Sequence, residues 1–345
     1  MHRLLALLAM LFCAASLSAA NYKLNLFIWS EYIDPDIITE FEKRFDAKVV
    51  VDLYEDESAM LAKLQGGGAA QYDVIVPPDH VVPALIKLNL VAPLRQQNIP
   101  NLRHVDPRFA SPWYDPSNRF TVPYQWGTLG IYARKPAASA APYRESWALL
   151  FDAKEQRGDF VLIDSARDAI GAALKFKGHS LNSTDKPHLA DARDRLVDAK
   201  KRSRGFAGGV GGKNKVLAKE VAMAMAYSGD ALRGINEDAD TCYFIPKEGS
   251  QIWMDNLAVC AKAPNRLVAE RFLNFILTPE IGARLADYNL YATPNLAARA
   301  HVRPENLANS IIYPPTDVMQ RLEFLQDVGK GRQLYDEVWT QIKAR

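Results

Sequence analysis

The sequence has no excess of charge of one sign, which argues against a nucleic-acid-binding protein. Its 345 residues include 42 Lys and Arg against 40 Asp and Glu, a net charge of +2. Proteins that bind DNA or RNA usually carry a basic stripe or patch. Apolar residues make up 48% and charged residues 24%, the balance of an ordinary globular protein. This composition excludes a disordered chain, a collagen and a small disulfide scaffold.

The sequence also lacks the motifs of common enzymes. Its six histidines are scattered, and none falls in a metal-ligand spacing such as HExxH. There is no GxSxG elbow, no GxxxxGK[ST] loop and no GxGxxG after a predicted strand. We therefore expect no cofactor, no bound metal and no catalytic residue. A secreted enzyme stays the least favoured alternative.

Long apolar runs are missing except at the N-terminus, from Leu4 to about Leu17. A short basic start precedes this run, and small residues precede the bond after Ala20. This pattern predicts a cleaved signal peptide over residues 1–20. The run is too short for a permanent membrane anchor. We expect residues 21–345 to be soluble and exported.

Cysteine is scarce, and Cys13 lies within the predicted signal peptide, which leaves Cys242 and Cys260. Both fall in strand-like segments, and a hairpin turning near Gln251 would place them opposite each other. An oxidising compartment favours a Cys242–Cys260 disulfide. Two free buried thiols are equally compatible with the sequence.

The remaining sequence alternates between strand and helix patterns, which predicts an α/β fold with parallel strands. Strands are expected at 23–28, 48–53, 72–76, 160–164, 220–226, 241–246 and 255–261. Helices are expected after Asp34-Pro35 and at 58–65, 81–88, 166–175, 191–200, 265–277 and 316–344. The glycine-rich segment 205–212 is expected to be a loop, and 227–230 a turn.

Aromatic and acidic residues recur where the predicted strands end or begin. They occur at Trp29–Tyr32, Tyr227–Asp230, Trp253–Asp255 and Asp164–Asp168. Ligands of open α/β sheets bind outside the strand ends. Aromatic faces attract cations, and a carboxylate forms a charge-assisted hydrogen bond with an ammonium. Any one cluster could be core or turn, but four together predict a site for an organic cation.

The segments FIWSEYI (27–33), YDVIVP (72–77), PYQWGTLGIY (123–132), PKEGSQIWMDNLAV (246–259) and TPNLAAR (293–299) resemble those of the bacterial periplasmic polyamine-binding proteins. These are the spermidine- and putrescine-binding subunits of ABC importers. The resemblance implies a two-lobe, type II-like periplasmic-binding-protein fold with the ligand cleft between lobes joined by crossing strands. Lobe 1 would comprise 21–129 plus 254–297, and lobe 2 would comprise 130–253 plus 298–345.

The same resemblance implies which residues bind the ligand. They are Trp29, Ser30, Glu31, Tyr32, Asp168, Tyr227, Asp230, Trp253, Asp255 and Tyr291. Ser165 and His80 stand where relatives have other residues, and a charged His80 beside the ligand would weaken cation binding near neutral pH. The implied ligand is putrescine, spermidine or a related cation such as agmatine.

The implied partners are the permease subunits of an ABC transporter, with the binding protein a monomer. No nucleic-acid partner is expected. A binding protein or sensor input for a different small cargo is the main alternative, although an acidic cargo would require a cluster of Arg or Lys at the strand ends.

Overall fold

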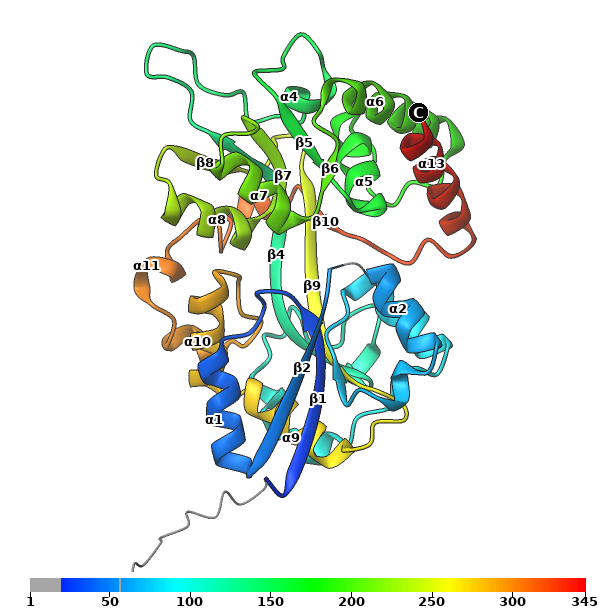
Figure 1. The fold of residues 1–345 in the computed structure, drawn as a ribbon, viewed down its shortest axis with the longest axis vertical. Coiled ribbons are helices and arrows are strands. Elements are labelled where there is room, and N and C mark those ends of the chain that lie inside the picture. The colour runs from blue at the N-terminus through cyan, green and yellow to red at the C-terminus, as the bar shows by residue number, and fades with distance from the viewer. Residues whose placement is uncertain (1–19, 56) are drawn as a thin grey trace, which may run out of the picture.

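The computed structural model describes residues 20–55 and 57–345. Figure 1 shows two α/β lobes, one above the other, joined by two long strands that run through both. These strands are β4 (Thr121–Arg134) and β9 (Ser250–Val259). The two-lobe fold expected from the sequence is therefore confirmed. The predicted signal peptide, with Cys13, lies outside the described residues except for Ala20.

Strands from both lobes share one sheet. The other strands of the described chain are β1 (Tyr22–Trp29), β2 (Ala47–Tyr54), β3 (Val74–Ile75), β5 (Phe160–Ile163), β6 (Phe206–Ala207), β7 (Met223–Tyr227), β8 (Thr241–Phe244) and β10 (Leu322–Phe324). Their order is β2-β1-β3-β9-β4-β7-β5-β6, with β8 paired to β4 and β10 paired to β9. Because β9 comes late in the chain yet lies between β3 and β4, the chain crosses between the lobes more than once.

Helices cover the sheet in both lobes. They are α1 (Pro35–Phe45), α2 (Glu57–Gln65), α3 (Val82–Lys87), α4 (Ala148–Phe151), α5 (Ala166–Phe176), α6 (Lys186–Arg202), α7 (Gly209–Leu217), α8 (Ser228–Glu237), α9 (Arg266–Ile276), α10 (Pro279–Asn289), α11 (Pro304–Leu307), α12 (Thr316–Met319) and α13 (Arg332–Ala344). In Figure 1, α1, α2, α9 and α10 belong to the lower lobe, and α4 to α8 with α13 to the upper.

Each lobe has its own hydrophobic core. In the lower lobe Leu24 and Ile28 of β1 pack with Phe41 of α1 and Phe272 of α9. Helix α1 begins at Pro35, and the side chain of Asp34 caps it by accepting a hydrogen bond from the Asp36 amide. A proline in the first turn and an Asp cap are the start signals that the sequence displays.

The upper lobe is built in the same way around a second cluster. Phe160 of β5, Ile170 of α5, Leu196 of α6 and Tyr335 of α13 are buried together. Two separate cores joined by two strands are the arrangement expected of lobes that can move relative to each other.

The expected disulfide is wrong, because Cys242 and Cys260 are both free thiols. The predicted hairpin does not form, since β8 and β9 follow one another along the same edge of β4. Cys242 of β8 pairs with Ala133 near one end of β4. Cys260 follows β9 two residues after Ala258, which pairs with Thr121 at the other end of β4. At about 3.4 Å per residue, these two points on β4 are about 40 Å apart.

The glycine-rich segment 205–212 is not a loop, because half of it belongs to α7 and two of its residues to β6. Glycine is unfavourable in a helix, but here it allows α7 to pack closely on β7. A Cβ at Gly212 would lie 3.2 Å from the Ala224 Cβ and 3.3 Å from the Met225 carbonyl oxygen. Close packing therefore outweighs helix propensity at this position.

Two further expectations are wrong in part. Residues 227–230 are not a turn, since Tyr227 ends β7 and α8 begins at Ser228. Residues 316–344 are not one helix, because β10 separates α12 from α13 and pairs with β9. Gly329 and Gly331 precede α13, and the positive φ of Gly329 (54°) fits a break before the helix.

Candidate functional site

Aromatic rings from four parts of the chain form a continuous line between the lobes. Tyr32, just after β1, contacts Tyr291 with ring centroids 5.8 Å apart. Tyr291 contacts Trp253 of β9 at 5.0 Å, and Trp253 contacts Tyr227 of β7 at 5.9 Å. The sequence motifs that supply these rings are separated by up to about 260 residues, and the fold brings the rings into contact.

A carboxylate lies at each end of this aromatic line. The Tyr32 hydroxyl donates a hydrogen bond to the Asp255 Oδ2 at 2.7 Å. The Tyr227 hydroxyl donates to the Asp168 Oδ2 at 2.5 Å. Asp255 and Asp168 are only 7% and 5% exposed, and the described residues form no ion pair with either of them. Buried carboxylates without a cationic partner are costly, which points to a cation that is supplied from outside.

Local structure explains the direction of these side chains. Trp253 and Asp255 are two residues apart on β9, so both point to the same face of the sheet. Asp168 is in the first turn of α5 and Asp230 in the first turn of α8. The positive end of a helix dipole favours an ionised carboxylate there.

Two glycines make room for the rings. A Cβ at Gly127 of β4 would lie 2.6 Å from the Trp253 ring and 3.0 Å from the Tyr291 ring. A Cβ at Gly229 would lie 2.6 Å from the Tyr291 ring. Any larger residue at either position would displace a ring of the aromatic line.

The carboxylates of the line have raised pKa values. Burial is the largest cause for Asp255, and it raises the pKa of this carboxyl to about 8 against the hydrogen bond from Tyr32. Burial also raises the pKa of Asp168, partly offset by hydrogen bonds from Tyr227 and Ser165. Each carboxylate would therefore gain from a cation at neutral pH.

His80 is paired on both sides by carboxylates. Its Nε2 lies 3.0 Å from the Glu57 Oε2 and its Nδ1 lies 3.2 Å from the Asp79 Oδ1. Burial alone would lower the pKa of His80, but the two carboxylates outweigh it and raise this pKa to about 10. The two carboxylates thus favour the charged form of His80 at neutral pH, and its effect on ligand affinity stays a prediction.

Asp230 is paired within its own helix. Arg233 of α8 donates a hydrogen bond to the Asp230 Oδ1, and its Nη2 lies 3.8 Å from the Glu31 Oε2. The same guanidinium donates to the Asn289 carbonyl oxygen at 2.9 Å and lies 6.0 Å from the centre of the Tyr291 ring. Arg233 could not be singled out from the sequence, because it pairs with Asp230 through the i,i+3 spacing of a helix, and residues 227–230 were expected to be a turn.

The other predicted residues lie around this group. Trp29 donates a hydrogen bond to the Val76 carbonyl oxygen at 3.1 Å and contacts Tyr54 with ring centroids 4.4 Å apart. Ser30 is half-buried at the end of β1, and Glu31 is exposed with a left-handed φ of 51°. Ser165 precedes α5 at its N-cap position.

Gln125 was not predicted. It is 1% exposed and pairs in register with Asp255 across β4 and β9, so the two side chains share a face. Neither polar atom of its side chain has a hydrogen-bond partner among the described residues. Unpaired buried amides are rare, and this one lies beside Asp255, whose pKa burial raises to about 8.

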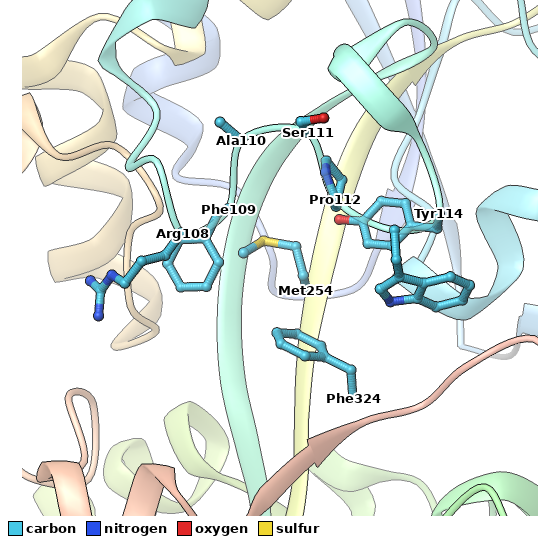
Figure 2. A pocket seen from close by; sticks show the side chains of 9 residues that line it. Arg108, Phe109, Ala110, Ser111, Pro112, Tyr114, Met254 and Phe324 are labelled. Atoms are coloured by element: carbon cyan, nitrogen blue, oxygen red, sulfur yellow. The ribbon is translucent and has the colours of Figure 1, made fainter.

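A separate cavity of about 230 Å³ lies on the opposite face of the crossing strands. Figure 2 shows Met254 of β9 and Phe324 of β10 beside the segment from Arg108 to Tyr114. Met254 alternates with Trp253 and Asp255 and so points away from them. None of the predicted binding residues lines this cavity.

Two findings bear on other kinds of site. Across residues 20–55 and 57–345, no group of three or more His, Cys, Asp and Glu side chains is arranged to hold a metal ion. In the same part of the chain, no helix is both long and apolar enough to cross a membrane.

Comparison with known families gives a match over most of the chain. The model of the bacterial extracellular solute-binding proteins matches residues 36–310. The chain belongs to this family. Its members are solute-binding transport proteins, and the two-lobe fold in Figure 1 agrees with that membership.

Individual solute-binding relatives resemble the chain over nearly its full length. The spermidine/putrescine-binding periplasmic protein of Escherichia coli K12 is 31% identical and covers 96% of this chain and 95% of its own. The putrescine/cadaverine-binding protein of Pseudomonas aeruginosa is 29% identical and covers 100% of both. Among solved structures, the substrate-binding protein PotD of a Streptococcus pneumoniae spermidine/putrescine ABC transporter has a TM-score of 0.80. It is 29% identical and covers 94% of this chain and 99% of its own.

Proposed function

We propose that this protein captures putrescine, spermidine or a closely related organic cation in the periplasm and delivers it to an ABC permease. The observation that carries the proposal is the aromatic line between Asp255 and Asp168, two buried carboxylates that form no ion pair with any residue the structure describes. Rings and carboxylates together recognise ammonium groups through cation–π attraction and charge-assisted hydrogen bonds. Relatives named for spermidine and putrescine binding support the same ligand class.

The ligand lies between the rings in this proposal. Its methylene chain packs against Trp253, Tyr291 and Tyr32, and its ammonium groups meet Asp255 and Asp168. Trp29, Tyr227 and Ser30 border the site, and Ser165 supports Asp168. Transfer of an ammonium from water costs several kcal/mol, and an ionised partner at each end offsets that cost.

Binding closes the lobes. Residues 21–129 with 254–297 and residues 130–253 with 298–345 move as two bodies about β4 and β9. Asp255 belongs to the first body and Asp168 to the second, so one ligand that contacts both stabilises the closed form. The closed form then docks on the permease, and no covalent bond is made or broken. The protein is a transport component and not an enzyme.

Isothermal titration of the mature chain tests the proposal. Asp255→Asn and Asp168→Asn are each expected to weaken putrescine binding by about 2–5 kcal/mol, the usual cost of truncating one side of a buried charged pair. Asp52→Asn is the matched control. Asp52 lies on the outer strand β2, its side chain is exposed, and it forms an ion pair with Lys63 of α2. This control should bind like the wild type.

The panel should contain putrescine, spermidine and agmatine, with amino acids and divalent metal ions as comparison cargoes. Wild-type protein that binds none of the three amines would rule out the proposed ligand class. Binding that is indifferent to Asp255 and Asp168 would keep the ligand class but refute the proposed site.

A further inference from the structure

Arg233 places a cation of the protein itself beside the aromatic line. The groups around its guanidinium are those that recognise an ammonium: the Asp230 and Glu31 carboxylates, the Asn289 carbonyl oxygen and the Tyr291 ring. The Arg233 side chain is 19% exposed and that of Asp230 is 7% exposed. The pair is therefore largely shielded from water, where charge pairing is strong.

We propose that Arg233 is an internal counter-ion that fills the Asp230 end of the cleft and so limits the number of ligand ammonium groups the site can hold. This inference rests on the proposed function. Asp230 is neutralised by its own helix neighbour, whereas Asp255 and Asp168 form no ion pair among the described residues. The wild-type cleft consequently offers two unpaired carboxylates to the ligand, which suits a diamine better than a triamine.

The other charged side chains near Asp230 do not replace Arg233 as its partner. Lys213 of α7 acts on Asp230 through its charge, but its ammonium lies 3.6 Å from the Glu237 Oε1. Glu31 is 54% exposed and contributes through a 3.8 Å contact that solvent partly screens. Arg233 is thus the principal partner of Asp230.

The pairing makes a specific prediction about Asp230. If Asp230 serves Arg233 and not the ligand, its removal harms binding only by leaving the Arg233 charge uncompensated in the cleft. Removal of both charges should then restore binding of a diamine. If Asp230 instead contacts the ligand, removal of Arg233 cannot compensate for its loss.

A double-mutant cycle with Asp230→Asn, Arg233→Gln and their combination measures this. Putrescine and spermidine binding is determined by isothermal titration, with thermal unfolding as a check that each variant folds. We expect Asp230→Asn to weaken putrescine binding about 30-fold or more, and the double variant to return within about threefold of the wild type. Arg233→Gln should raise the affinity for spermidine relative to putrescine about tenfold, because one more carboxylate is free.

Two controls accompany the cycle. Arg284→Gln removes the same charge from an Arg–Glu40 pair in which both side chains are more than 40% exposed, and it should leave the spermidine-to-putrescine ratio unchanged. Arg233→Lys retains the positive charge and should keep the wild-type ratio. If Arg233→Gln does not fold, Arg233→Lys still tests the counter-ion role, because a changed spermidine-to-putrescine ratio in this variant would contradict it.

The outcomes separate this inference from the proposed function. A double variant as weak as Asp230→Asn, or an Arg233→Gln variant with an unchanged ratio, would overturn the counter-ion role while wild-type amine binding stands. Equal weakening of both amines by Arg233→Gln would also overturn it, because Arg233 would then stabilise the closed form through Asn289. Wild type and variants that all bind no amine would overturn the proposed function as well.

Discussion

At the residue scale, the motifs that carry both a ring and a carboxylate supply side chains that lie together in the structure, and their role in ligand binding stays a prediction. Trp253 and Asp255 lie together on β9, and their partners Tyr32 and Tyr291 contact them directly. The sequence missed Gln125 because nothing distinguishes a glutamine in a strand until the strand's partner is known. It missed the pairing of His80 because Glu57 lies 23 positions away and reaches it only through the fold.

Asp255 should release a proton when an amine binds. Its pKa of about 8 means that the ligand-free carboxyl is mostly protonated at pH 7, and a bound ammonium favours the ionised form. Titrations of putrescine in phosphate and in Tris should therefore give apparent enthalpies that differ with the ionisation enthalpy of the buffer. Affinity should rise from pH 6 to pH 9, until the amine itself loses its charge.

Asp255→Asn should abolish the buffer dependence, and Asp52→Asn should keep it. Equal enthalpies in both buffers for the wild type would show that Asp255 is already ionised.

The raised pKa of Asp255 also affects the stability of the fold. Because the pKa is raised from 3.8 in the unfolded chain, the contribution of Asp255 to stability is complete below that pH and is lost as pH rises to about 8.

At the scale of elements, alternation of strand and helix patterns predicted most of the fold, and the errors occurred where tertiary packing overrides local preference. Helix α7 forms from a glycine-rich segment because it packs on β7, and β10 interrupts the predicted C-terminal helix because it pairs with β9. The wrong disulfide has the same origin. A hairpin is the simplest connection between two strands, but β8 and β9 both pair with β4.

Strand β4 supports the aromatic line through Gly127. Gly127→Ala should destabilise the fold by about 1–3 kcal/mol, since the added methyl overlaps the Trp253 ring. It should also weaken amine binding, because Trp253 must move. Thermal unfolding and isothermal titration measure the two effects.

The matched control is Gly171→Ala in α5. A Cβ there lies 3.4 Å from Leu181, an ordinary contact, and alanine is the better helix former. This variant should be as stable as the wild type or more so, with unchanged binding. A Gly127→Ala variant that behaves like Gly171→Ala would show that Trp253 does not depend on the close approach at β4.

At the scale of the whole molecule, the order of strands explains why one ligand can control two lobes. Strands β4 and β9 run through both lobes (Figure 1), and β4 contributes side chains to both hydrophobic cores. Trp253 of the aromatic line lies on β9, one of these two strands. The boundaries of the moving bodies stay a prediction. The resemblance of five motifs suggested this architecture, whereas composition and periodicity alone predicted only an α/β protein.

The most direct test of the central claim is a crystal structure of the mature protein with putrescine. We predict that the ligand lies along Trp253 and Tyr291, with one ammonium nitrogen about 2.7–2.9 Å from a carboxylate oxygen of Asp255 and the other at a similar distance from Asp168. Arg233 should still be paired with Asp230. Putrescine bound elsewhere, for example in the cavity beside Met254 and Phe324, would contradict the account.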